Sequence, residues 1–334
     1  MKLNEILSQQ GVVLQSPSDG DIRNRARDVQ PVKLFYGETY DDKGETLDSM
    51  KYYFFVDALS QSLLQEGFET DPVILVADTA ACRNVSRGLE RIYMKLGEER
   101  ARFVETVNDT YGTGLRVVKM SEYISTPEFQ EHLRGIIETC RDDSKLMEAV
   151  ERTVPESKLE IERSRGFGYS FDEIATIIDL DVKIGPPRED LYDGIAREIA
   201  RRRKEKELMS LFLTPTFPLG KRWDYFFSNE GIEDHGITAY KGGSKRLQGN
   251  RILIGKTRIE YAENLIDASF MSENPVLPNP VLDAGIITEM AKRRLKGDDS
   301  PITLADDFYS GRLSQEELRR KVVEQLGEYV LSQF

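Results

Sequence analysis

Five short apolar runs, rich in valine, isoleucine and leucine, alternate with longer helical patterns along this chain of 334 residues. Runs of this length and composition are typical of strands that are buried on both faces, as in a parallel sheet. They span residues 32–36, 73–77, 115–119, 176–184 and 210–213. Because parallel strands need long crossover connections, usually helices, this order predicts an α/β protein with a Rossmann-type doubly wound parallel sheet.

The segments between these runs carry the patterns expected of crossover helices. Residues 48–66 repeat apolar side chains at helical spacing, and residues 86–110 form a second helical stretch. Residues 126–165 interrupt the alternation with a mostly charged helical segment, for which a solvated helical pair is one interpretation. The last part of the chain is helical again, so we expect a large α/β domain over 1–256 and a helical domain over 257–334.

Two kinds of local signal occur in the helical regions. Ser314 followed by Glu317 has the spacing of a capping box, which predicts a helix start. Basic clusters occur at 201–204, 292–294 and 319–321. Because acidic residues lie close to each cluster, their pattern favours solvated helix faces over contacts with a phosphate backbone.

Composition limits the classes of partner and site. The net charge of −12 argues against a broad surface that coats nucleic acid, and it leaves a local basic patch for RNA open. Cys82 and Cys140 are too few for a disulfide framework or a zinc site, so no metal-ligand cluster is predicted. The N-terminus lacks a signal-peptide pattern, and no apolar run is long enough to span a bilayer. We therefore expect a cytoplasmic protein without a membrane partner.

Several stretches resemble, in the same order, the class I aminoacyl-tRNA synthetases, and most closely the archaeal-type tyrosyl-tRNA synthetases. They are residues 66–84, 114–133, 180–200, 213–220, 248–255 and 311–330. The resemblance implies a divergent paralogue with a class I synthetase core over 1–256 and an anticodon-binding-like domain over 257–334. It also implies that the insertion at 126–165 serves dimer contacts in a homodimer. ATP, Mg²⁺ and tRNA are the cofactors and the partner that it implies.

The nucleotide-binding signatures of that family are degraded here. The H-x-G-H motif is absent, since the only histidines are His132 and His235, and its place is taken by LDSMKYYFF with Lys51. The mobile K-M-S-K-S loop corresponds to GSKRLQ, where Lys245 and Arg246 supply cations for the departing pyrophosphate. Lys51, Lys245 and Arg246 are therefore the candidate catalytic residues. The alternatives are a solvated lysine at a helix start and a solvated basic loop.

Candidate cofactor-binding residues follow the first and fourth predicted strands, where open α/β sheets bind ligands. Gly37 permits a close backbone approach, and the loop after it offers polar groups. The ribose-binding motif of the family falls at GPPRED, where Arg188 suits a phosphate or carboxylate and Glu189 a ribose hydroxyl. The alternatives are an ordinary glycine turn and a surface Arg–Glu pair. The candidate set is Gly37, Thr39, Gly185, Arg188, Glu189 and Asn250.

Tyrosine recognition in the family uses polar side chains on the helix before the fourth strand, which corresponds to residues 166–178. Phe167, Phe171 and Ile174 take those places and cannot hydrogen bond a phenol, which argues for a changed substrate. The alternative is that these residues are simply part of the core. The candidate substrate pocket is Phe35, Glu38, Asp78, Phe171 and Ile174.

Three functions remain open at this point. The first is a divergent tyrosyl-tRNA synthetase-like protein that binds ATP or an aminoacyl-adenylate-like ligand, activates a small carboxylate as an ATP-dependent ligase, and has lost normal tyrosine charging. The second is a non-catalytic pseudo-synthetase that binds RNA or protein. The third resembles the cyclodipeptide synthases, which act on aminoacyl-tRNA, although Thr39 and Tyr40 stand where those enzymes use a serine.

Overall fold

The computed structural model describes residues 31–38, 46–79, 90–154, 160–180, 189–203, 210–213, 281–282, 285, 289 and 303–331. In chain order its strands and helices are β1 (Val32–Glu38), α3 (Thr46–Gln65), β2 (Thr70–Val76), α5 (Glu90–Tyr111), β3 (Arg116–Lys119), α6 (Met120–Ile124), α7 (Pro127–Arg141), α8 (Ser144–Glu151), α9 (Glu160–Leu180), α10 (Glu189–Arg203), β4 (Ser210–Leu213), α15 (Leu304–Tyr309) and α16 (Gln315–Leu331).

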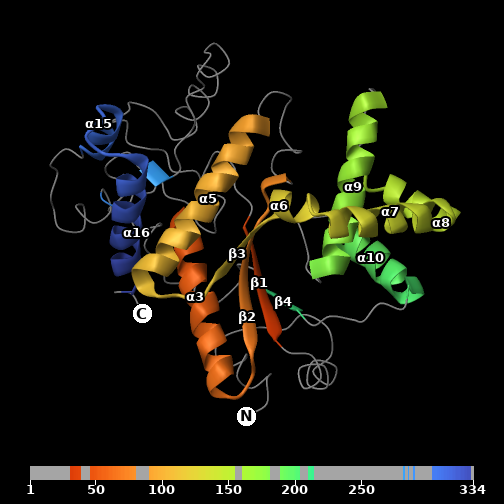
Figure 1. Cartoon of the computed structure of the whole chain (residues 1–334), viewed down its shortest axis with the longest axis horizontal. Coiled ribbons are helices and arrows are strands. Elements are labelled where there is room, and N and C mark those ends of the chain that lie inside the picture. The colour runs from red at the N-terminus through yellow and green to blue at the C-terminus, as the bar shows by residue number, and fades with distance from the viewer. Residues whose placement is uncertain are drawn as a thin grey trace, which may run out of the picture. The chain divides into compact units, whose positions relative to one another are not determined.

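The strands form one four-stranded sheet in the order β3-β2-β1-β4, and every neighbouring pair is parallel (Figure 1). In the register of β1 with β2, Glu38 lies opposite Val76, and in the register of β1 with β4, Tyr36 lies opposite Leu213. Since β2 lies on one side of β1 and β4 on the other, the strand order reverses at β1. The predicted α/β fold with a Rossmann-type parallel sheet is confirmed.

The chain forms two compact units, each assembled from separate segments. The first comprises residues 1–39, 59–86 and 116–214, and the second comprises residues 40–58, 87–115 and 215–334. The sheet and helices α6 to α10 belong to the first unit. Helices α5, α15 and α16 belong to the second. The predicted domain boundary at residue 256 lies outside the described residues and stays a prediction.

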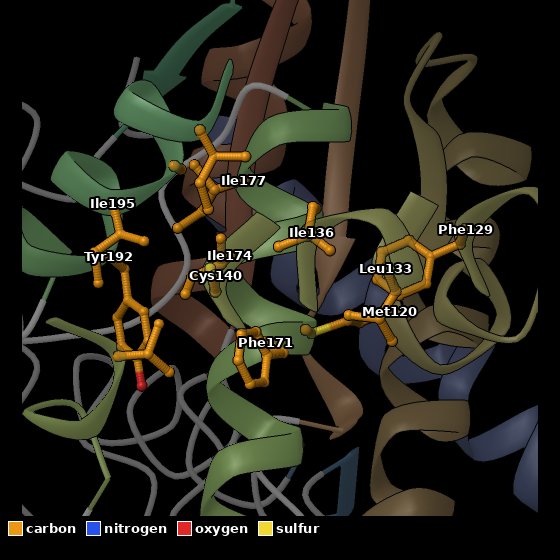
Figure 2. Close-up of a cluster of buried hydrophobic side chains, with 14 of the residues drawn as sticks. Met120, Phe129, Leu133, Ile136, Cys140, Phe171, Ile174, Ile177, Tyr192 and Ile195 are labelled. Atoms are coloured by element: carbon orange, nitrogen blue, oxygen red, sulfur yellow. The ribbon is translucent and has the colours of Figure 1, made fainter. Parts of the chain in front are cut away.

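One face of the sheet packs on the helices of the first unit. Phe35 of β1 and Val73 of β2 lie opposite each other in the register, and both are almost completely buried. Figure 2 shows the helical side of this core, where side chains from α6, α7, α9 and α10 converge. The labelled side chains are Met120, Phe129, Leu133, Ile136, Cys140, Phe171, Ile174, Ile177, Tyr192 and Ile195.

Helix α9 passes through the middle of this core. Every side chain from 170 to 177 is buried, so this stretch is enclosed on all sides. The strand predicted over 176–184 is therefore wrong for residues 176–180, which form the last turns of α9, while residues 181–184 lie outside the described part. The last turns of α9 read Thr-Ile-Ile-Asp-Leu, and a short run of apolar and β-branched residues cannot be distinguished from a buried strand by its period alone.

In the second unit, α16 packs on α5 with Leu318, Val322 and Leu326 buried. The predicted capping box at its start is confirmed. The hydroxyl oxygen of Ser314 accepts the backbone N–H of Glu317 at 3.2 Å, and the Glu317 carboxylate accepts the N–H of Ser314 at 2.9 Å. These reciprocal bonds satisfy two donors that a helix start would otherwise leave unpaired.

Candidate functional site

The reversal of strand order at β1 marks the place in the sheet where a ligand is expected. In open parallel α/β sheets, ligands bind outside the carboxyl ends of the strands, at the point where the order reverses. Here that point lies between the ends of β1 and β4, at Glu38 and Leu213. Gly37 precedes Glu38, lies opposite Leu75 and is partly exposed. The structure thus places two predicted site residues, Gly37 and Glu38, at this edge.

Asp78, which follows β2, is the buried carboxylate of the same edge. Its side chain is 1% exposed. Its Oδ1 accepts the backbone N–H groups of Thr79 and Ser121, each at 2.8 Å, and its Oδ2 accepts the hydroxyl of Ser121. Asp78 was predicted to line the substrate pocket, and the structure shows that both of its oxygens already have donors within the protein.

The hydrogen bonds of Asp78 have a structural consequence for α6. This helix begins directly after β3, and its N-cap residue, Lys119, makes no side-chain capping hydrogen bond. The carboxylate of Asp78 takes over that role from the neighbouring strand, because it accepts the N–H of Ser121 in the first turn. The ends of β2 and β3 are thereby tied together at the carboxyl edge.

Sequence reasoning missed Lys119 and Ser121, which also lie at this edge. The ammonium group of Lys119 forms a 2.6 Å ion pair with Glu122, and the lysine side chain is 23% exposed. A signal was present in the sequence, because both residues stand at or just after the end of a predicted parallel strand, where ligand-contacting residues gather.

The remaining predicted site residues fall into three groups. Phe35, Phe171 and Ile174, predicted to line the substrate pocket, all belong to the buried apolar core of the first unit, and Figure 2 labels Phe171 and Ile174 within it. Lys51 lies in α3, and Glu189 is the first residue of α10. The others lie outside the described residues: Thr39, Gly185, Arg188, Lys245, Arg246 and Asn250.

A buried polar network, also missed from the sequence, lies inside the helical core. Thr153 and Ser170 are 2.6 Å apart between their hydroxyl oxygens, and Ser170 lies 3.3 Å from the hydroxyl of Tyr192. Burial and, next, the charge of Glu173 raise the pKa of Tyr192, so its phenol stays protonated. The signal was the group of polar residues within 170–176, in a stretch that is otherwise apolar.

Two features are absent from the part of the chain that the structure describes. No cluster of three or more histidine, cysteine, aspartate or glutamate side chains that could hold a metal ion occurs in that part of the chain. None of the described helices is long and apolar enough to cross a membrane.

No protein-family model and no curated protein sequence matches the chain. Among solved structures, it is similar to the tyrosyl-tRNA synthetase of Aeropyrum pernix, with 16% identity, 100% of this chain and 94% of that chain covered, and a TM-score of 0.47. The tyrosyl-tRNA synthetase of Archaeoglobus fulgidus, solved with L-tyrosine, matches at 16% identity, 99% and 98% coverage, and a TM-score of 0.48.

The chain is also similar to a CDPS (cyclodipeptide synthase) from Fluoribacter dumoffii. The identity is 10%, 60% of this chain and 96% of that chain are covered, and the TM-score is 0.41. Likeness at this level of identity says nothing about activity. The parallel sheet, with its reversal of strand order at β1, itself establishes the α/β Rossmann-type core.

Proposed function

We propose that this chain is a divergent, tyrosyl-tRNA synthetase-like protein that binds ATP or an aminoacyl-adenylate-like ligand at the carboxyl edge of its sheet and activates a carboxylate other than tyrosine. The observation that carries the proposal is the reversal of strand order at β1, with Gly37 next to the end of that strand. A glycine at this place gives a phosphate or ribose close access to the backbone.

The described residues at this edge fit part of such a ligand. The ammonium of Lys119, which pairs with Glu122 at 2.6 Å, lies near the end of β3 and is a group of the kind that anionic phosphates favour. When bound, ATP would supply the adenylyl group and release pyrophosphate. The proposal assigns the neutralisation of that pyrophosphate to Lys245 or Arg246, with Mg²⁺ carried by the nucleotide phosphates.

The proposed loss of tyrosine specificity follows from the apolar side chains of α9. Phe171 and Ile174 face the apolar core, and neither can donate or accept a hydrogen bond. A site that binds a hydroxyl rejects analogues without one by several orders of magnitude, and a site without polar groups loses that discrimination. The proposed partner is tRNA or another RNA, and the proposed active form is a homodimer in the cytoplasm.

The test is a calorimetric titration of the full chain with ATP and Mg²⁺, followed by ATP–pyrophosphate exchange with each standard amino acid. The proposal expects ATP binding, exchange with at least one amino acid, and none above background with tyrosine. Robust exchange with tyrosine would show that the degraded motifs suffice for the ancestral reaction. Absence of ATP binding would refute the proposal.

A second candidate function is a non-catalytic pseudo-synthetase, which the burial of Phe35, Phe171 and Ile174 in the core favours. If these side chains fill the space that an amino acid occupies in an active enzyme, the scaffold would keep only its RNA- or protein-binding surfaces. Binding of tRNA in a gel-shift assay, together with no ATP binding, would support this candidate. Consumption of aminoacyl-tRNA without ATP would instead support a cyclodipeptide synthase-like function.

A further inference from the structure

Helix α6 is held by a carboxylate from another element near each of its ends. It is five residues long and leaves the carboxyl end of β3 directly. A single turn has almost no stability of its own, because nucleating a helix is unfavourable. Its position must therefore come from contacts with neighbouring elements. Asp78 provides the first of these through Ser121.

The second contact joins α6 to the end of α9. The hydroxyl of Tyr123 donates a 3.0 Å hydrogen bond to Oδ2 of Asp179, which lies in the last turn of α9. The ring of Tyr123 also packs edge-on against Phe129, with 5.3 Å between the ring centres. Burial and, next, the charge of Asp179 raise the pKa of Tyr123, so the phenol remains a hydrogen-bond donor at neutral pH.

Asp179 holds a third helix through its other oxygen. Nδ1 of His132, in α7, contacts Oδ1 of Asp179. The two side chains are 16% and 20% exposed, so this contact is largely shielded from solvent. A carboxylate in such surroundings interacts more strongly with a neighbouring polar group than it would at an open surface, because the local dielectric is lower. One carboxylate thus joins α6, α7 and α9.

We propose that Asp179, acting through Tyr123 and His132, is a positioning residue that fixes α6 against the carboxyl edge of the sheet and thereby sets the affinity of that edge for its ligand. The coupling runs through Ser121. Tyr123 stands two residues after Ser121, so a shift of α6 moves the two donors that Ser121 presents to Asp78. Asp78 would then lose its fixed orientation beside the site. This inference rests on the proposed function.

The experiment compares Tyr123→Phe and Asp179→Asn with the wild-type chain. Tyr123→Phe keeps the ring against Phe129 and removes only the hydroxyl, while Asp179→Asn keeps the shape and removes the charge. Tyr309→Phe, in α15 of the second unit, is the matched control, because it deletes the same hydroxyl outside the proposed group. Two quantities are measured: the Kd for ATP with Mg²⁺, and the amide hydrogen-exchange rates of residues 121–125.

We expect both variants to exchange these amides about tenfold faster and to bind ATP about tenfold more weakly, whereas the control variant should change neither quantity. Unchanged exchange rates in α6 of the two variants would overturn the inference. If the wild-type chain binds ATP, an unchanged Kd in the two variants would also overturn it. If the wild-type chain binds no ATP, the proposed function fails by itself. The exchange rates then decide whether Asp179 anchors α6.

Discussion

Arg319 of α16 donates two hydrogen bonds to the carboxylate of Glu99 in α5. Nε lies 2.6 Å from Oε1, and Nη2 lies 2.8 Å from Oε2. The two side chains are 8% and 14% exposed, so the pair is nearly buried. The basic cluster at 319–321 was predicted to be a solvated helix face, and for Arg319 that prediction is wrong. Its sequence could not reveal this, because Glu99 is 220 residues away.

Removing one member of this pair should cost more than removing both. Arg319→Ala leaves the Glu99 carboxylate buried without its partner, which typically costs about 3–5 kcal/mol of unfolding free energy. Arg319→Met with Glu99→Leu replaces the pair by apolar side chains and should cost clearly less. Arg320→Ala, at an exposed neighbouring position, is the control and should change stability by less than about 0.5 kcal/mol. Urea unfolding measures all three, and equal losses in the single and double variants would contradict the prediction.

The stability of the first unit should fall in acid because of Glu198 in α10. Hydrogen bonds from Arg201 and, next, Arg202 lower the pKa of Glu198 from 4.5 to about 2. Because the folded-state pKa lies below the unfolded one, the stabilisation is complete above pH 4.5 and is lost as the pH falls towards 2. The Glu198 side chain is 34% exposed and its two arginine partners are exposed, so the effect should be small and should shrink at high salt.

The measurement is the urea midpoint between pH 7 and pH 3 for the wild type and Glu198→Gln. The variant should lose less stability over this interval, since it has no carboxylate to protonate. Glu131→Gln, an exposed change beyond the first turn of α7, serves as the control and should follow the wild-type curve. A Glu198→Gln curve parallel to that of the wild type would show that the Arg201 and Arg202 contacts contribute nothing in solution.

The strands of the sheet were predictable because each coincides with a short apolar run in the sequence. The run at 210–213 coincides with β4, and the run at 115–119 differs from β3 by one residue. The helix predicted over 48–66 corresponds to α3, which spans Thr46–Gln65. Each of these depends on residues near in sequence: a short run of apolar side chains for a strand, and a helical spacing for a crossover.

The functional edge was only partly predictable, because its contacts join residues far apart in sequence. Gly37 and Asp78 could be placed at the edge, since both follow predicted strands. That Asp78 caps α6 depends on Ser121, 43 residues later, and on the neighbouring position of β2 and β3 in the sheet. Likewise, nothing local distinguishes Asp179 from a surface carboxylate, and its role emerges only when three helices are packed together.

Gly327 of α16 should resist substitution by alanine, because an added Cβ would overlap the ring of Tyr111. The Tyr111 hydroxyl donates to the backbone carbonyl of Glu324 at 3.0 Å, so the ring cannot move without breaking that bond. Alanine gains about 1 kcal/mol of helix propensity, but the overlap costs about 1–3 kcal/mol. We therefore expect Gly327→Ala to lower the thermal midpoint.

The matched control for this prediction is Gly194→Ala in α10, where an added Cβ would meet nothing within 4 Å. That variant should be neutral or stabilised by up to about 1 kcal/mol. In a Tyr111→Ala background the overlap at residue 327 disappears, so the penalty of Gly327→Ala should vanish in a double-mutant cycle. A Gly327→Ala variant as stable as Gly194→Ala would mean that α16 does not approach Tyr111 this closely.

The capping role of Asp78 predicts a graded response to its substitution. Asp78→Ala removes the acceptor of two backbone N–H groups and of the Ser121 hydroxyl, so it should cost about 2–3 kcal/mol. Asp78→Asn keeps one acceptor oxygen for the N–H groups, and the Ser121 hydroxyl can rotate to accept from the amide, so the cost should be about 1 kcal/mol. Asp57→Ala is the control, because its Oδ1 accepts a single exposed N–H, that of Gly114, at 3.0 Å. Urea unfolding gives the free energies, and hydrogen exchange at residues 121–125 locates the effect. If Asp78→Ala cost no more than Asp57→Ala, the carboxylate would be free to serve a ligand, as the sequence had predicted.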